Sequence, residues 1–183
     1  MSLAGRLLVA APLLGDPNFD RTVVLLLSHD DDGAVGVVVN RPTEVPVDSV
    51  LPTWQPVVSA PDVIFQGGPV GTDNALGLVA LAAGDDEPLG VRRVSGPLAV
   101  VDLDAPPELV SPAVVGMRVF AGYAGWSPDQ LESEIGEGAW YVVDAEVTDA
   151  FAESTDGLWR AVLRRQPGSL AWLADFPPDP SLN

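Results

Sequence analysis

The chain has 183 residues, of which 26 are acidic and nine are basic, so its formal net charge at pH 7 is −17. A chain of this length suits one domain with one core, and so acidic a protein repels polyphosphate, which argues against direct binding to nucleic acid. All nine basic residues are arginine, and the absence of cysteine excludes disulfides, thiolate metal sites and thiol nucleophiles.

From the residue pattern, we expect no targeting signal at the N-terminus. The apolar run after Arg6 is short, is interrupted by Pro12 and lacks the small-residue cleavage pattern of a secretory signal. No uninterrupted apolar run approaches the roughly 20 residues that a membrane span requires. We therefore expect a cytoplasmic protein without a membrane partner, folded as one domain over residues 1–183.

Apolar and β-branched runs predict the strands of the first half. Residues 7–11 form a first strand, and residues 22–28 and 34–40 form a hairpin whose turn is marked by Asp32 and Gly33. Both hairpin strands are nearly continuous in apolar residues, so we expect both faces to be covered.

Weaker signals follow the hairpin. Residues 45–54 should contain a short helical turn, and a buried strand at Val63–Gln66 leads into a glycine-rich segment. Its predicted partner is a strand at residues 76–81, followed by an exposed acidic loop at residues 84–88. We assign Arg92 and Arg93 to a loop as well.

The second half mixes strands with helices. Strands are predicted at residues 98–103, 118–123 and 140–147. Ser127, Pro128 and Gln130 have the spacing of a cap, a first helical residue and a capping box, so a helix should begin at Ser127. Gly136 is its expected left-handed stop.

The C-terminal part has helical periodicity. A helix at residues 156–165 should bury Trp159 and leave Arg160 and Arg164 partly exposed, and a short helix follows at residues 170–174. Prolines in residues 176–183 forbid helix there. Strands dominate and helices concentrate C-terminally, which predicts an α+β fold with a mixed sheet that curls into a partial barrel.

His29 is the single histidine, so mechanisms that need two imidazoles are excluded. It precedes three aspartates, but the run lacks the ligand spacing of a calcium loop, and Arg41 stands where the bidentate glutamate would be. A solvated turn is therefore the preferred interpretation over a cation site.

Three other features have a functional and a structural interpretation. The segment from Gly67 to Gly71 could bind an anion through its backbone N–H groups, but a tight turn is favoured. Arg21 and Arg41 could each hold a carboxylate or phosphate, but pairing with Asp16, Asp20 or Glu44 is favoured. Tyr123 and Trp126 either line a pocket or belong to the core.

Four segments together resemble the YqgE/AlgH family: residues 5–42, 65–70, 120–140 and 179–183. The resemblance covers essentially the whole chain. It implies a largely antiparallel, bifurcated sheet curled into a pseudo-barrel, with a few short helices that lie mostly towards the C-terminus. Members are often labelled putative transcriptional regulators, and no biochemical activity is established for the family.

We expect the turn at residues 16–21, the strand end at residues 40–42 and a loop at residues 123–126 to form one site, because their arginine, amide and aromatic groups are more specialised than strand packing requires. We expect no catalytic residue, metal or cofactor there. The candidate ligand-binding residues are Asp16, Asn18, Phe19, Arg21, Asn40, Arg41, Gly67, Gly68, Tyr123 and Trp126.

The leading interpretation is a cytoplasmic ligand- or protein-binding domain with an indirect regulatory role, whose partner is an unknown protein or small molecule. One alternative is a hydrolase or metal enzyme that acts on a small anion through Arg21, Arg41 and His29. Another is a DNA-binding regulator, which is disfavoured because the arginines are scattered along an acidic chain.

Overall fold

The long strand β9 (Val114–Trp126) lies at the centre of the sheet in the computed structural model, which describes residues 1–84 and 86–177. Ten strands belong to this sheet over the described residues, and the main path runs β10-β1-β2-β3-β9-β6-β8-β7. Most of the C-terminal segment in which we expect no helix, residues 178–183, lies outside the described residues. Residue 85 of the predicted acidic loop lies outside them too.

The other strands are β1 (Leu7–Ala10), β2 (Val23–Asp30), β3 (Gly33–Val38), β4 (Pro42–Pro46), β5 (Val63–Gln66), β6 (Val70–Leu81), β7 (Val91–Ser95), β8 (Leu98–Val101) and β10 (Trp140–Val143). Their pairs are antiparallel except that between β5 and β9. The α-helices are α1 (Pro107–Val110), α2 (Gln130–Gly136), α3 (Val147–Ala150) and α4 (Leu158–Arg164). Four 3-10 segments complete the described chain: η1 (Val47–Ser49), η2 (Gln55–Val57), η3 (Ser111–Ala113) and η4 (Gly168–Asp175).

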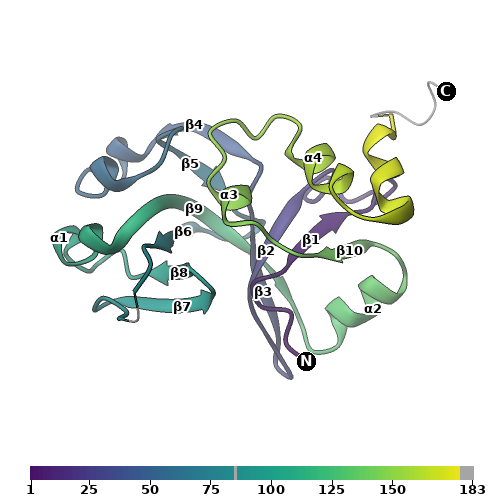
Figure 1. Ribbon diagram of the computed structural model, residues 1–183, viewed down its shortest axis with the longest axis horizontal. Coiled ribbons are helices and arrows are strands. Elements are labelled where there is room, and N and C mark those ends of the chain that lie inside the picture. The colour runs from purple at the N-terminus through teal and green to yellow at the C-terminus, as the bar shows by residue number, and fades with distance from the viewer. Residues whose placement is uncertain (85, 178–183) are drawn as a thin grey trace.

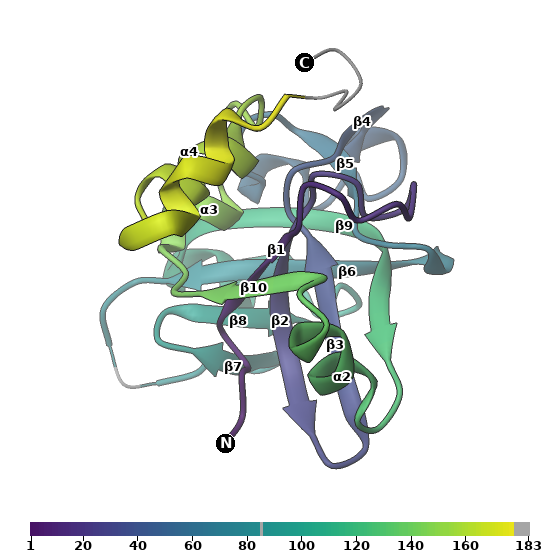
Figure 2. The same cartoon turned by 90° about the vertical axis from the view of Figure 1, so that its right-hand side faces the viewer.

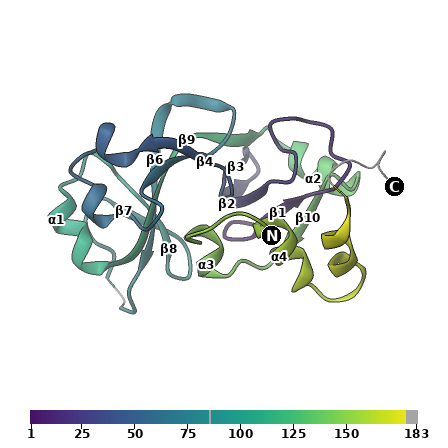
Figure 3. The same ribbon diagram turned by 90° about the horizontal axis from the view of Figure 1, so that it is seen from above.

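The sheet forks along β9. Phe120 and Ala121 of β9 pair with β6 on one edge and with β5 on the other, whereas residues 124–126 pair with β3. The halves therefore separate: β6, β7 and β8 lie with α1 in one, and β1, β2, β3 and β10 lie with α2 and α4 in the other (Figures 1 and 3). The result is a curled half-barrel of mostly antiparallel strands with few short helices, which is the predicted α+β class.

Both faces of the β1–β2–β3 layer are covered, as their continuous apolar runs predict. Leu7 and Val9 of β1 enter a core cluster with Trp159 of α4. Leu8 enters a second cluster with Leu131 of α2 and further aromatic residues. Figure 2 shows α2 and α4 at different sides of these strands. No helix among the described residues has the length and apolar character needed to cross a membrane.

The central helix differs from its prediction at its start. α2 begins at Gln130, because the N–H of Gln130 donates to the carbonyl of Ser127 and so closes a turn first. The side chain of Gln130 accepts from the N–H of Ser127, but the residue at the cap position is Asp129, with a left-handed φ of 64°. The helix does end at Gly136, and the left-handed residue is Gly138 (φ 81°).

Other bounds were predicted less well. β6 and β9 extend further than predicted, so the expected loop at residues 123–126 is part of a strand. β7, which contains Arg92 and Arg93, was assigned to a loop, and α3 was not predicted. The structure confirms that Trp159 is buried while Arg160 and Arg164 keep exposed surface.

Candidate functional site

Arg41, which lies between β3 and β4, binds the 16–21 turn. Its guanidinium donates to the carbonyls of Asn18, Pro17 (3.2 Å) and Asp20 (3.1 Å). Inside the turn, the carboxylate of Asp16 accepts from the N–H of Asn18 at 2.9 Å. The expected pairing of Arg41 with a nearby carboxylate is thus wrong, because turn carbonyls take its donors.

The backbone of Arg21 is held in an unfavourable conformation. Its φ is 54°, which costs a non-glycine residue about 1–2 kcal/mol. The side chain of Asn40 fixes it on both sides: its amide nitrogen donates to the carbonyl of Arg21, and its oxygen accepts from the N–H of Val23, each at 3.0 Å. Such strain persists where neighbours over-determine it, and it clusters at functional sites. Asn40 is thus a positioning residue for Arg21.

The side chain of Arg21 points towards the C-terminal part of the chain. Its guanidinium carbon lies 4.5 Å from the centre of the Trp159 ring, and that of Arg160 lies 5.9 Å from the same ring. Neither arginine forms an ion pair with a carboxylate of the described residues. The pKa of Arg21 is lowered by partial burial and by the charge of Arg160, against the opposite effect of Asp20.

A hollow of about 200 Å³ lies beside this pair, and we call it the paired-arginine hollow. Its lining residues come from the end of the 16–21 turn, from the segment after β3, and from the residues that precede and begin α4. They are Arg21, Asn40, Thr155, Asp156, Gly157, Leu158, Trp159 and Arg160. Two guanidinium groups and a hydroxyl suit an oxyanion, and the Asp156 carboxylate suits a hydrogen-bond donor on the same ligand.

Phe19 connects the 16–21 turn to a cluster of tryptophans. Its ring is stacked on Trp126, with centres 6.3 Å apart, and meets the edge of Trp140 at 5.4 Å. Both indole N–H groups donate to Glu134, at 3.3 and 3.1 Å. Trp126 is only 6% exposed, so it belongs to the core and lines no open pocket.

Gly67 and Gly68 lie at the fork of the sheet. The N–H of Gly67 donates to the carbonyl of Ala121, and its carbonyl accepts from Val38, each at 2.8 Å. A Cβ on Gly68 would lie 2.2 Å from the backbone of Tyr123. Glycine is required here for a close crossing of strands, and the amide of Gly67 is not available to an anion.

The predicted residues therefore separate into two groups. The first group lies in or against the 16–21 turn and consists of Asp16, Asn18, Phe19, Arg21, Asn40, Arg41 and Trp126. The second group lies at the fork of the sheet and consists of Gly67, Gly68 and Tyr123. Of the first group only Arg21 and Asn40 line the paired-arginine hollow. Sequence reasoning missed Thr155 and Arg160 as site residues, because no local pattern connects α4 with the 16–21 turn.

His29 occupies a different place. Its Nδ1 accepts from the N–H of Leu3 at 3.0 Å, so Nε2 carries the proton and donates to the carboxylate of Glu132. This hydrogen bond lowers the pKa of Glu132. Asp30 and Asp31 line a hollow of about 280 Å³ beside the pair, but no group of three ligating side chains in the described residues has metal-site geometry. His29 thus fastens the N-terminus and α2 to the hairpin.

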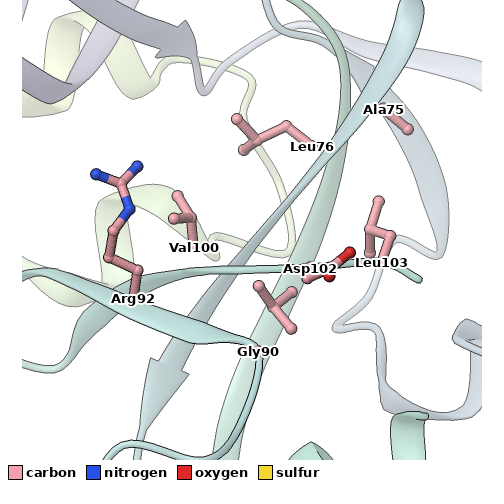
Figure 4. A pocket seen from close by; sticks show the side chains of 8 residues that line it. Ala75, Leu76, Gly90, Arg92, Val100, Asp102 and Leu103 are labelled. Carbon is pink, nitrogen blue, oxygen red and sulfur yellow. The ribbon is translucent and has the colours of Figure 1, made fainter. Parts of the chain in front are cut away.

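A larger hollow, of about 430 Å³, lies over β6, β8 and β7. Figure 4 shows Leu76 and Val100 in its middle, with Arg92 to one side and Asp102 to the other. One oxygen of Asp102 already accepts from the N–H of Asp104 at 2.9 Å. The charged groups of this larger hollow do not converge on one point, so it is a weaker candidate for a binding site than the paired-arginine hollow.

A family model described as AlgH-like matches residues 7–171. The chain is 57% identical to the UPF0301 protein SCO2948 of Streptomyces coelicolor over 185 residues, which cover 100% of this chain and 96% of that protein. It is 52% identical to a UPF0301 protein of Thermobifida fusca over 194 residues, with the same coverage.

Two solved structures are also similar. Protein DIP2367 of Corynebacterium diphtheriae has a TM-score of 0.90 at 36% identity, over 94% of this chain and 92% of that one. The AlgH protein of Pseudomonas aeruginosa has a TM-score of 0.68 at 28% identity, over 96% of this chain and 94% of that one. These similarities agree with the half-barrel described above.

Proposed function

The chain belongs to the AlgH-like family, and we propose that it is a non-enzymatic binding domain that holds the carboxylate or phosphate group of a small molecule in the paired-arginine hollow. The observation that carries this proposal is the placement of Arg21 and Arg160 on one tryptophan ring without a described carboxylate partner. Two like charges held close together are unfavourable, and an oxyanion between them would neutralise both.

Six of the other seven arginines support the choice of this pair. Arg6, Arg93, Arg164 and Arg165 form ion pairs with carboxylates of the chain. Arg41 is taken by turn carbonyls, as described above, and Arg118 is fully buried. In a chain of net charge −17, an uncompensated pair is the place where an anion would be least repelled.

In this proposal the protein acts in the cytoplasm and influences regulation indirectly, through a protein partner that responds to the bound ligand. Direct contact with duplex DNA is not part of it. A DNA-binding module would need most of its arginines on one face, whereas Arg164 and Arg165 are engaged by Asp175 and Asp149.

The enzymatic alternative requires Arg21, Arg41 and His29 to act on one small anion. The three side chains have different surroundings: Arg21 lines the paired-arginine hollow, His29 lines the hollow beside Glu132, and Arg41 binds the 16–21 turn. These positions favour binding without catalysis.

Calorimetric titration of the purified chain with inorganic phosphate, and separately with succinate, tests the proposal. We expect a dissociation constant of about 0.1–1 mM for one of the two, which also distinguishes a phosphate from a carboxylate ligand. Arg21→Gln and Arg160→Gln should each weaken binding at least about tenfold, because charged hydrogen bonds are worth about 1.5–3 kcal/mol.

Arg92→Gln is the matched control, since it removes the same charge from the hollow over β6, β8 and β7. It should change the affinity less than about twofold. The proposal is wrong if both anions fail to bind both to the full chain and to a chain ending at Asp175. It is also wrong if Arg92→Gln weakens binding as much as Arg21→Gln does.

A further inference from the structure

The two arginines of the paired-arginine hollow contact residues 174–177, which we call the C-terminal strap. Nη2 of Arg21 donates to the carbonyls of Phe176 (2.9 Å) and Pro177 (2.7 Å). Arg160 donates to the carbonyls of Ala174 and Phe176, the latter at 3.3 Å. Both guanidinium groups therefore bind carbonyl groups of this chain.

The strap is attached more firmly at one end than at the other. Ala174 is fully buried within the core cluster that contains Trp159. Phe176, by contrast, has an extended backbone (φ −63°, ψ 129°) and only partial burial, and its N–H donates to the carbonyl of Leu173 at 3.0 Å. Pro177 has no N–H to donate. Figure 1 shows the chain leaving η4 beside α4 at this point.

An ion pair next to the hollow also holds the strap. Asp175 pairs with Arg164 at 3.2 Å, and the two side chains are 80% and 60% exposed. Exposed pairs of this kind contribute little to stability. Residues 176 and 177 are thus held beside the hollow by the donors of Arg21 and Arg160 and by the packing of Phe176 against the core cluster.

An oxyanion competes directly with these contacts. A neutral carbonyl is a weaker acceptor than a carboxylate or phosphate oxygen, and a bidentate oxyanion on Arg21 requires the Nη2 group that the strap now uses. Bound ligand and bound strap therefore exclude each other at Arg21.

We propose that the C-terminal strap is an autoinhibitory element, which occupies Arg21 and Arg160 in the absence of ligand and is displaced from residue 176 onward when a small oxyanion binds. This inference rests on the proposed function. By linkage the coupling is reciprocal: a partner that captures the released strap raises the affinity for the anion, and the anion raises the affinity for that partner. Release of the strap would thus change the surface of the protein when the anion binds.

Deletion of residues 176–183 is the direct test. The chain that ends at Asp175 should bind inorganic phosphate or succinate about 5- to 20-fold more tightly than the full chain in the same calorimetric titration, within the usual range of coupling between sites. Circular dichroism checks that the shortened chain is folded, because Phe176 packs against the core cluster.

Arg164→Gln is a second variant that keeps the full chain, and it removes the ion pair of Asp175 without touching the hollow. It should raise the affinity by about twofold. Glu87→Gln, which removes the distant ion pair of Arg93, is its control and should change nothing. In the full chain, anion binding should also speed hydrogen exchange of the Phe176 amide.

The outcomes separate the two proposals. Equal affinity of the full and shortened chains would overturn the autoinhibitory strap and leave the binding function intact. Weaker binding by the shortened chain would also overturn it, since the strap would then be part of the binding site. Absence of binding in both chains would overturn the binding function, and the strap with it.

Discussion

Arg118 and Arg21 use the same chemistry in two regions of the molecule. Each guanidinium lies over an aromatic ring, at 4.2 Å from Phe65 and 4.5 Å from Trp159, and each donates to backbone carbonyls. Arg118 on β9 is fully buried, binds the carbonyls of Ala60, Ala150 and Ala152, and has its pKa lowered by burial to about 10. Arg21 instead lines a hollow that is open to solvent.

Access to solvent, and not residue type, therefore separates an arginine that joins buried segments from one that can bind a ligand. The buried Arg118 remains charged at neutral pH and joins the segments around Ala60 and Ala150 to β9. Its Nε has no acceptor among the described residues, which adds to the cost of burying it. The donors of Arg21 instead bind the carbonyls of the C-terminal strap, and in our proposal a ligand oxygen replaces these carbonyls as the acceptor.

The largest effect should come from removing the brace. Arg118→Ala should lower the free energy of unfolding by about 3–5 kcal/mol, because it leaves three carbonyls unpaired and opens a cavity. Urea denaturation measures this, with the exposed Arg92→Ala as the control, expected within about 0.5 kcal/mol of the wild type. A loss below about 1 kcal/mol for Arg118→Ala would mean that Arg118 is not a brace.

A smaller loss of stability is expected at Asn40, whose side chain binds the backbone of Arg21. Asn40→Ala should cost about 2 kcal/mol in the same assay, because it leaves the buried N–H of Val23 unpaired and frees the carbonyl of Arg21. It should also weaken phosphate or succinate binding, although Asn40 donates nothing to the anion in this account. Unchanged binding would show that the strained backbone does not position Arg21.

The strain itself can be measured by comparing two variants at Arg21. Both Arg21→Gly and Arg21→Ala lose the guanidinium, but only glycine adopts a φ of 54° without a steric penalty. Arg21→Gly should therefore be more stable than Arg21→Ala by about 1 kcal/mol. Equal stabilities would indicate that the left-handed conformation stores no strain.

The smallest effect is expected outside both regions. Ser127→Ala would cost about 1 kcal/mol if Ser127 capped a helix, but its hydroxyl contacts only the exposed side chain of Gln130. We expect a change within about 0.5 kcal/mol in urea denaturation. A full 1 kcal/mol loss would restore the original cap assignment.

Local sequence signals predicted the parts of the fold that depend on local physics. The strand Val63–Gln66 has its predicted bounds, and the β2–β3 hairpin follows from β-branched runs around an aspartate–glycine turn. The C-terminal end of β9 was missed because Gly125 was assigned to the expected loop at residues 123–126. Within the strand, Gly122 is required by the close approach of Gly68 from the segment between β5 and β6. β7 was missed because its two arginines interrupt the apolar pattern.

The candidate site was predicted only in part for the same reason. Arg21 and Asn40 stand out locally, as polar residues at the ends of apolar strands. Their partner Arg160 comes from near the other end of the chain, and only the packing of α4 on the sheet brings it to Trp159 and Arg21. No local pattern in a single sequence predicts that contact.

A phosphate and succinate titration followed through the tryptophan indole N–H signals tests most directly whether the paired-arginine hollow binds an oxyanion. The Trp159 ring lies beneath both guanidinium groups, whereas Trp126 and Trp140 donate to Glu134 in a different cluster. We expect the Trp159 signal to shift with saturation while the signals of Trp126 and Trp140 stay fixed, and we expect Arg21→Gln to abolish the shift. Binding in the paired-arginine hollow is contradicted if the titration moves Trp126 or Trp140 instead, or if the Trp159 signal stays fixed both in the full chain and in the chain ending at Asp175.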